Sequence, residues 1–141
     1  MAVKADFSEA EWQAMQRGVT GAGMLVSVSD QDLSDSFGES SAMAKYLSSQ
    51  RTIGATQLMR DLGSTHGTGF GIFAKPQEVR DGTLDALRST VATLQAKAPD
   101  EVEPYRQLVL GTATAVAEAK GGVKPTEEAA LQLIREALGS V

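Results

Sequence analysis

The chain contains no cysteine, and this absence excludes disulfide bonds, thiolate metal sites and cysteine nucleophiles together. Aromatic residues are also scarce, at 5% of the 141 residues, so the core must be built from aliphatic side chains and alanine. Proteins without disulfides are typical of reducing compartments. We therefore expect a single domain with an aliphatic core, located in the cytoplasm.

Long apolar runs are missing as well. The longest mostly apolar stretch, residues 19–28, is interrupted by Gly21, Gly23 and Ser27 and reaches roughly half of the ~20 residues that a membrane-spanning helix needs. The first residues lack the apolar region and the cleavage site of a secretory signal. The sequence therefore predicts neither a membrane span nor secretion.

Clusters of basic residues are the third absence. The 13 Lys and Arg residues are scattered and are outnumbered by 18 acidic residues, which gives a net charge of −5. Nucleic-acid binding depends on clustered basic side chains that neutralise phosphates. The composition argues against nucleic acid as a partner and favours cations or basic proteins.

The chain does show a clear helical periodicity. Ser8 and Glu11 have the spacing of a capping box, which places the start of the first helix near Ser8. From there apolar residues recur every three or four positions, as they do on one face of a helix, and no segment alternates with a period of two. We predict an all-α single-domain helical bundle of about six helices over residues 1–141, with an N-terminal tail at 1–7 and a Gly-rich loop at 63–75.

The periodicity also assigns the core. The second helix is expected over residues 37–49 and the third over 52–62; the fourth should begin at Pro76, and the sixth at Pro125. The residues expected to face the core are Trp12, Met15, Val19, Ala22, Val26, Ala44, Leu47, Ala55, Leu58, Met59, Leu62, Leu84, Leu87, Val91, Leu94, Ala98, Tyr105, Leu108, Val109, Thr112, Val116, Leu131, Ile134 and Leu138.

Three glycines fall inside the predicted first helix. Gly18, Gly21 and Gly23 each cost roughly 1 kcal/mol of helix stability relative to alanine. We expect that another backbone crosses closely at this point, or that the helix bends. A break near Gly21 is the alternative.

An acidic cluster follows this helix and is the main candidate for chemistry. Asp30, Asp32, Asp35 and Glu39 surround a predicted helix–helix corner, where carboxylates can supply oxygen ligands to Ca²⁺ or Mg²⁺. The spacing is not that of an EF-hand, because Asp35 stands at the position that requires glycine and Ser41 at the position of the final glutamate. The alternative role for these acids is to cap the next helix.

A glycine-rich loop is the second candidate. Residues 63–71 hold four glycines, and the segment from Gly67 to Gly71 resembles a phosphate-binding loop. Its context does not fit, since a helix rather than a strand precedes it and Lys75 comes too late for a Walker motif. The only histidine, His66, lies in the same loop without an assigned carboxylate or nucleophile partner. A mobile surface loop is the simpler expectation.

Residues 117–131, AEAKGGVKPTEEAAL, resemble the corner motif of the TerB-like domains associated with tellurite resistance, and residues 26–47 resemble it more faintly. That resemblance implies an all-helical fold with a pseudo-twofold pair of helical hairpins. In the later corner Lys120 stands where the family has Asp, whereas Glu127 and Glu128 match its acids. In the earlier corner Asp30 matches the family Asp and Gln31 replaces its Gly.

The sequence constrains the function of the protein less than it constrains the fold. The resemblance implies a stress-linked, non-enzymatic module that binds metal ions and joins complexes through partner proteins. A second hypothesis is a structural subunit that self-associates through Gly- and Ala-rich helix faces, with no metal or small-molecule role. A small-molecule hydrolase or nucleotide enzyme, based on His66 and the glycine loop, is a third. The sequence predicts a protein partner or a homo-oligomer.

Overall fold

The computed structural model describes residues 2–29, 36–65, 75–119 and 125–139. These residues form six α-helices, two short 3₁₀ turns and no strand, which confirms the predicted all-α bundle. The elements are η1 (Lys4–Asp6), α1 (Glu9–Ser29), α2 (Ser36–Ile53), α3 (Gln57–Leu62), α4 (Pro76–Lys97), η3 (Pro99–Glu101), α5 (Val102–Glu118) and α6 (Pro125–Ala137).

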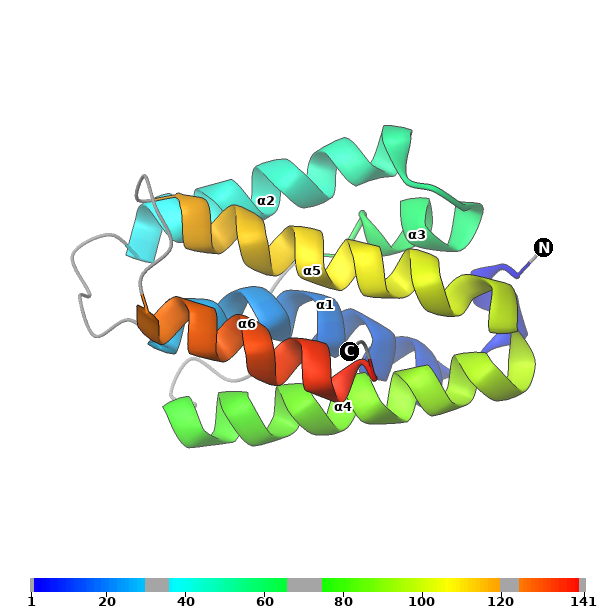
Figure 1. Cartoon of the computed structure of the whole chain (residues 1–141). Coiled ribbons are helices and arrows are strands. Elements are labelled where there is room, and N and C mark those ends of the chain that lie inside the picture. The colour runs from blue at the N-terminus through cyan, green and yellow to red at the C-terminus, as the bar shows by residue number, and fades with distance from the viewer. Residues whose placement is uncertain (1, 30–35, 66–74, 120–124, 140–141) are drawn as a thin grey trace.

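Helix α1 is the central element of the bundle, because α4, α5 and α6 all pack against it. Helices α1 and α5 run in one direction, and α2, α4 and α6 run in the opposite direction (Figure 1). Helix α2 lies on the outer side of α5 and has few contacts with α1. Within the described ranges we find no helix that pairs the length of a bilayer crossing with a sufficiently apolar surface.

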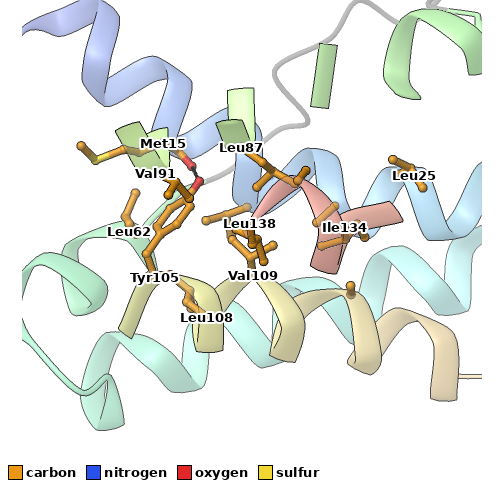
Figure 2. Close-up of a cluster of buried hydrophobic side chains, with 14 of the residues drawn as sticks. Met15, Leu25, Leu62, Leu87, Val91, Tyr105, Leu108, Val109, Ile134 and Leu138 are labelled. Atoms are coloured by element: carbon orange, nitrogen blue, oxygen red, sulfur yellow. Dashed lines mark hydrogen bonds between the residues drawn. The ribbon is translucent and has the colours of Figure 1, made fainter. Parts of the chain in front are cut away.

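The predicted apolar face of α1 forms the centre of the core. All five of its predicted residues, Trp12, Met15, Val19, Ala22 and Val26, are buried. Around them lie side chains from α3, α4, α5 and α6, which Figure 2 shows converging on one interior. Tyr105 is fully buried there, and its hydroxyl donates a hydrogen bond to the Met15 carbonyl at 2.9 Å. Burial raises the pKa of Tyr105 well above its usual value, against a smaller opposing effect of the Thr90 hydroxyl, so the phenol remains a donor.

The glycines of α1 serve a purpose different from the predicted one. The helix is continuous from Glu9 to Ser29, so the alternative of a break near Gly21 is wrong. Among the described residues, the atoms nearest to these glycines belong to side chains and not to a crossing backbone. Side chains occupy the space that a Cβ would need, namely the Tyr105 hydroxyl at Gly18, Thr83 at Gly21 and Met43 at Gly23. The glycines therefore form notches that receive side chains from α5, α4 and α2.

The boundary between the second and third helices also differs from prediction. Helix α2 continues to Ile53 instead of ending near residue 49, and α3 begins only at Gln57. The reason is local, because Thr56 adopts an extended backbone and its side chain accepts a hydrogen bond from the Met59 amide, which caps α3. Ala44 and Ala55 were predicted in the core, but both are exposed.

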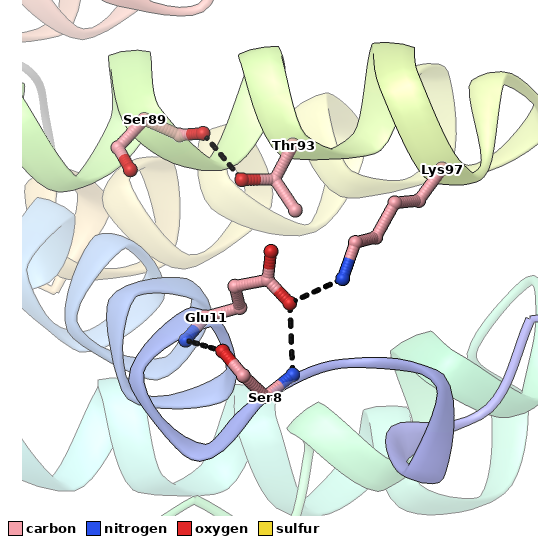
Figure 3. Close-up of polar contacts among 5 residues, drawn as sticks. All are labelled: Ser8, Glu11, Ser89, Thr93 and Lys97. Atoms are coloured by element: carbon pink, nitrogen blue, oxygen red, sulfur yellow. Dashed lines mark hydrogen bonds and ion pairs between the residues drawn. The ribbon is translucent and has the colours of Figure 1, made fainter.

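The N-terminal capping box is formed as predicted. The Ser8 hydroxyl accepts from the Glu11 amide at 3.1 Å, and a Glu11 carboxylate oxygen accepts from the Ser8 amide at 2.8 Å (Figure 3). The same oxygen of Glu11 lies 2.7 Å from the Lys97 ammonium, which ties the start of α1 to the end of α4. The predicted tail at residues 1–7 is partly packed, since Phe7 is buried and Lys4 lies over the Trp12 ring.

The Glu11 contacts predict a pH dependence. Its hydrogen bond to Lys97, then that to the Ser8 amide, lowers the pKa of Glu11 below its usual value of 4.5. A carboxyl with a lowered folded-state pKa stabilises the fold above its unfolded pKa, and this contribution is lost as the pH falls through the folded value. We expect the urea midpoint of the wild type to fall more than that of Glu11→Gln when the pH drops from neutral to about 3.5.

The control for this experiment is Glu9→Gln, which removes an exposed carboxylate that accepts a long bond from Gln13. This variant should lose stability with falling pH as the wild type does. Equal pH dependence of the wild type and Glu11→Gln would show that the Glu11–Lys97 pair contributes nothing to stability.

Candidate functional site

The predicted cation site falls largely outside the described residues. Asp30, Asp32 and Asp35 lie between α1 and α2, in a segment that is not described, and Glu39 lies in α2 with its side chain outside the description. Within the described residues no group of three or more His, Asp or Glu side chains is arranged to hold a metal ion. His66 and the segment 67–71 are likewise outside the description, so these sites stay predictions.

The described residues form a groove between α2 and α5. It has a volume of about 510 Å³ and is lined by residues of α2, α3 and α5. Helices α2 and α5 run in opposite directions (Figure 1). The lining residues are Tyr46, Gln50, Ala55, Met59, Pro104, Gln107, Leu108, Leu110, Gly111, Thr114, Ala115 and Glu118. The groove exists because α2 covers only one side of α5 and leaves the outward face open.

The contact of Tyr46 with Gly111 sets the width of this groove. The Tyr46 ring and hydroxyl lie where a side chain on Gly111 would be, so the absence of a Cβ there allows α2 to approach α5. Partial burial raises the pKa of Tyr46 above its usual value of 10, because a phenolate would be poorly solvated there. Tyr46 is partly buried and belongs to the lining of the groove.

The groove combines an apolar floor with polar edges. Met59 and Leu108 are buried at its base, at 1% and 2% exposure. Gln50, Gln107 and Thr114 place neutral amides and a hydroxyl along the sides, and Glu118 is the one charged residue of the described lining. Apolar surface bordered by neutral hydrogen-bonding groups is the composition of a protein–protein contact.

A partly buried hydrogen bond anchors α3 at its end of the groove. The Thr56 hydroxyl donates to a Glu101 carboxylate oxygen at 2.7 Å and accepts from the Met59 amide at 3.2 Å. Glu101 is 4% exposed and belongs to η3, just before α5. One hydroxyl thus joins the start of α3 to the corner between α4 and α5, which fixes Met59 at the base of the groove.

The two acids that match the TerB-like motif have different surroundings. Glu127 is completely buried in the first turn of α6, whereas Glu128 is exposed and its carboxylate lies 3.1 Å from Arg135. Acids in the first turn are favourable against the positive end of the helix dipole. Lys120, where the motif has Asp, lies outside the described residues.

Comparison with known proteins gives no relative. No family model, no curated protein and no solved structure matches the chain.

The sequence did not predict the groove. The prediction for α5 concerned its buried side, from Tyr105 to Val116, whereas the groove is lined by Gly111, Thr114 and Ala115 of the same helix. Small residues on the outer side of an otherwise apolar helix were the available signal. That signal was ambiguous, because the position of α2 relative to α5 depends on tertiary packing.

Proposed function

We propose that this chain is a non-enzymatic, TerB-like helical module that binds a partner protein in a stress or resistance context. The groove between α2 and α5 supports this proposal, because it offers an apolar floor and neutral polar edges over a volume of about 510 Å³. The resemblance of residues 117–131 to the TerB-like corner supports the family part of the proposal. We further propose a weak Ca²⁺ or Mg²⁺ site at Asp30, Asp32, Asp35 and Glu39.

An exposed apolar side chain lies close to the groove residues in the sequence. Ile53, the last residue of α2, is 70% exposed and lies in the sequence between the lining residues Gln50 and Ala55. A large aliphatic side chain at this exposure gains from being covered by a partner. A polypeptide segment lying along the groove would cover Ile53 and bring its own polar groups to Tyr46 and Gln107.

Filling the groove should abolish partner binding. Thr114 is half-buried at the groove edge, so Thr114→Trp places an indole over the floor without entering the core. We expect a protein captured with the wild-type chain from its native extract to be lost with Thr114→Trp. Quantitative mass spectrometry of the captured material, followed by calorimetry with the purified partner, measures the effect.

The matched control is Thr93→Trp, which makes the same substitution at a half-buried position of α4, away from the groove. It should bind the partner as the wild type does. Equal capture by Thr114→Trp and Thr93→Trp would reject the groove as the binding site. If the groove is occupied by a second copy, light scattering should report a dimer for the wild type and a monomer for Thr114→Trp.

That last result would support the alternative function, a self-associating assembly subunit. The exposed Ile53 and the small residues Gly111 and Ala115 at the groove favour close packing between helices of two copies. A monomer at tens of micromolar for the wild-type chain would remove this alternative.

The cation site has its own test. We expect calorimetric titration with CaCl₂ or MgCl₂ to show weak binding to the wild type and none to the double variant Asp30→Asn and Asp32→Asn, because amides bind these ions less strongly than carboxylates. Flat traces for both proteins would reject the cation site. They would leave the partner-binding proposal standing, since that rests on the groove.

A further inference from the structure

Tyr46 occupies the middle of the groove between α2 and α5. The described lining on α5 extends from Pro104 to Glu118, and Gly111 lies midway between them in the sequence. The far end of the Tyr46 side chain fills the space that a Cβ on Gly111 would need. A side chain of the protein itself therefore holds the central position at which a bound segment would contact α5.

The surroundings of this position suit an aromatic ring with a polar tip. Met59 and Leu108, at 1% and 2% exposure, belong to the same lining and provide apolar surface. Gln50 follows Tyr46 by four residues, one helical turn, and supplies an amide to the lining. Tyrosine and tryptophan combine a large apolar area with one hydrogen-bonding group, and they are enriched among the anchors of protein–protein contacts. The position that Tyr46 holds is suited to such a side chain from a partner as well.

Tyr46 can leave this position without detaching α2. Leu47 is 4% exposed and is the only buried side chain among residues 41–53, whereas Tyr46 is partly exposed. The contact at Gly111 is made by the distal end of the Tyr46 side chain, which moves when its χ1 angle changes from one rotamer to another. Rotation of the ring toward solvent would uncover Gly111 and leave the packing of Leu47 intact.

We propose that Tyr46 is an internal occupant of the groove, and that an aromatic side chain of the partner, a tyrosine or a tryptophan, replaces it above Gly111. This inference rests on the proposed partner-binding function and names the chemistry by which the groove recognises its partner. In the free protein the Tyr46 ring competes with the partner. The apparent affinity is therefore reduced by the fraction of molecules in which the position above Gly111 is open.

Titration of the full chain with p-cresol, the side chain of tyrosine as a free molecule, tests the proposal by amide NMR. Tyr46→Ala removes the internal ring and places a good helix former in α2, so this variant should fold. We expect saturable shifts centred on Gly111. Binding of p-cresol should be about tenfold tighter in Tyr46→Ala than in the wild type, the factor that applies if the position is open in about a tenth of wild-type molecules.

The wild type reports whether the ring is replaced. The chain contains two tyrosines, and Tyr105 is fully buried, so few ring signals need to be followed in a tyrosine-labelled sample. We expect saturating p-cresol to move the Tyr46 ring signals to those of a solvent-exposed tyrosine. Shifts at Gly111 with unchanged Tyr46 ring signals would place p-cresol beside the ring and overturn the proposal. The absence of saturable shifts at Gly111 in Tyr46→Ala would overturn it as well.

A second substitution locates the site. Gly111→Ala in the Tyr46→Ala background places a methyl group in the vacated space and should weaken p-cresol binding by at least about fivefold, the lower limit for overpacking. The matched control is Gly82→Ala in the same background, which adds a methyl group to a partly exposed position of α4, a helix outside the described lining. Equal weakening by the two substitutions would contradict the proposed position. Equally tight binding of 4-methylcyclohexanol, which lacks the flat ring, would show that the groove does not select aromatic groups.

The outcome is separate from that of the capture experiment with Thr114→Trp, because only the purified chain and p-cresol are used. If Thr114→Trp loses the partner and p-cresol does not bind above Gly111, the groove stands as the binding site and the aromatic anchor is rejected. If p-cresol replaces Tyr46 but Thr114→Trp still captures the partner, the partner-binding function of the groove is rejected, and the inference that rests on it is rejected too.

Discussion

Gly18→Ala should destabilise the protein, although alanine is the better helix former. The added methyl would occupy the position of the Tyr105 hydroxyl, which is fully buried and hydrogen-bonded to the Met15 carbonyl. Overpacking of a core costs about 1–3 kcal/mol and a displaced buried hydrogen bond about 1 kcal/mol more, against a helix-propensity gain of about 1 kcal/mol. We expect a net loss of about 2 kcal/mol in the free energy of unfolding, measured by urea denaturation.

A double-mutant cycle identifies the cause. Tyr105→Phe alone should cost about 1 kcal/mol, because it removes the hydroxyl and its bond to Met15. When Gly18→Ala is combined with Tyr105→Phe, the new methyl occupies the space that the hydroxyl has left, so the combined loss should be smaller than the sum of the two single losses by about 1–2 kcal/mol. Additive losses would show that the Tyr105 hydroxyl does not occupy the Gly18 notch.

Thr56→Ala should produce the second large loss of stability. The substitution removes the cap of α3, which is worth about 1 kcal/mol, and it leaves the buried oxygen of Glu101 without its donor, which costs about 1–3 kcal/mol. We expect the free energy of unfolding to fall by about 2–4 kcal/mol, read from thermal or urea unfolding followed by circular dichroism.

Thr56→Ser is the matched control, because it keeps the hydroxyl that both caps α3 and donates to Glu101. It should retain most of the wild-type stability, whereas Thr56→Val, which keeps the shape and loses the hydroxyl, should behave like Thr56→Ala. A loss of less than about 1 kcal/mol in both variants without a hydroxyl would mean that the bond to Glu101 contributes little.

The sequence predicted the helices of the bundle well where one face is repeatedly apolar. Met15 and Val19 in α1, Leu87 and Leu94 in α4, and Ile134 in α6 are all buried as predicted, because each helix packs one stripe against a shared core. Pro76 and Pro125 begin α4 and α6 as predicted, since proline suits the first turn of a helix.

The predictions were wrong where tertiary packing, and not the local sequence pattern, determines which residues are buried. Ala44 was assigned to the core by its spacing from Leu47, but α2 contacts the bundle along a narrow strip and leaves Ala44 in solvent. The glycines of α1 correctly predicted a close contact, but the contacting group is a side chain and not a backbone. The sequence does not show that Tyr105, on another helix, reaches Gly18. A helix boundary such as that at Thr56 depends on one hydrogen bond.

Candidate sites were harder to predict than helices for the same reason. The groove needs Tyr46 of α2 and Gly111 of α5 to be neighbours. The periodicity of the sequence does not indicate this pairing. The acidic cluster from Asp30 to Glu39 was found because its residues are close in the chain, and it stays a prediction.

Helix α2 buries few side chains against the bundle, and this leaves many of its residues free to vary in sequence. Leu47 is the only buried side chain among residues 41–53, so most of these thirteen positions can change with little loss of folding free energy. Two of those positions, Tyr46 and Gln50, border the groove. Natural variants could therefore acquire new binding preferences by substitution in α2 while α1, whose notches and apolar face are fixed by three neighbouring helices, keeps the scaffold constant.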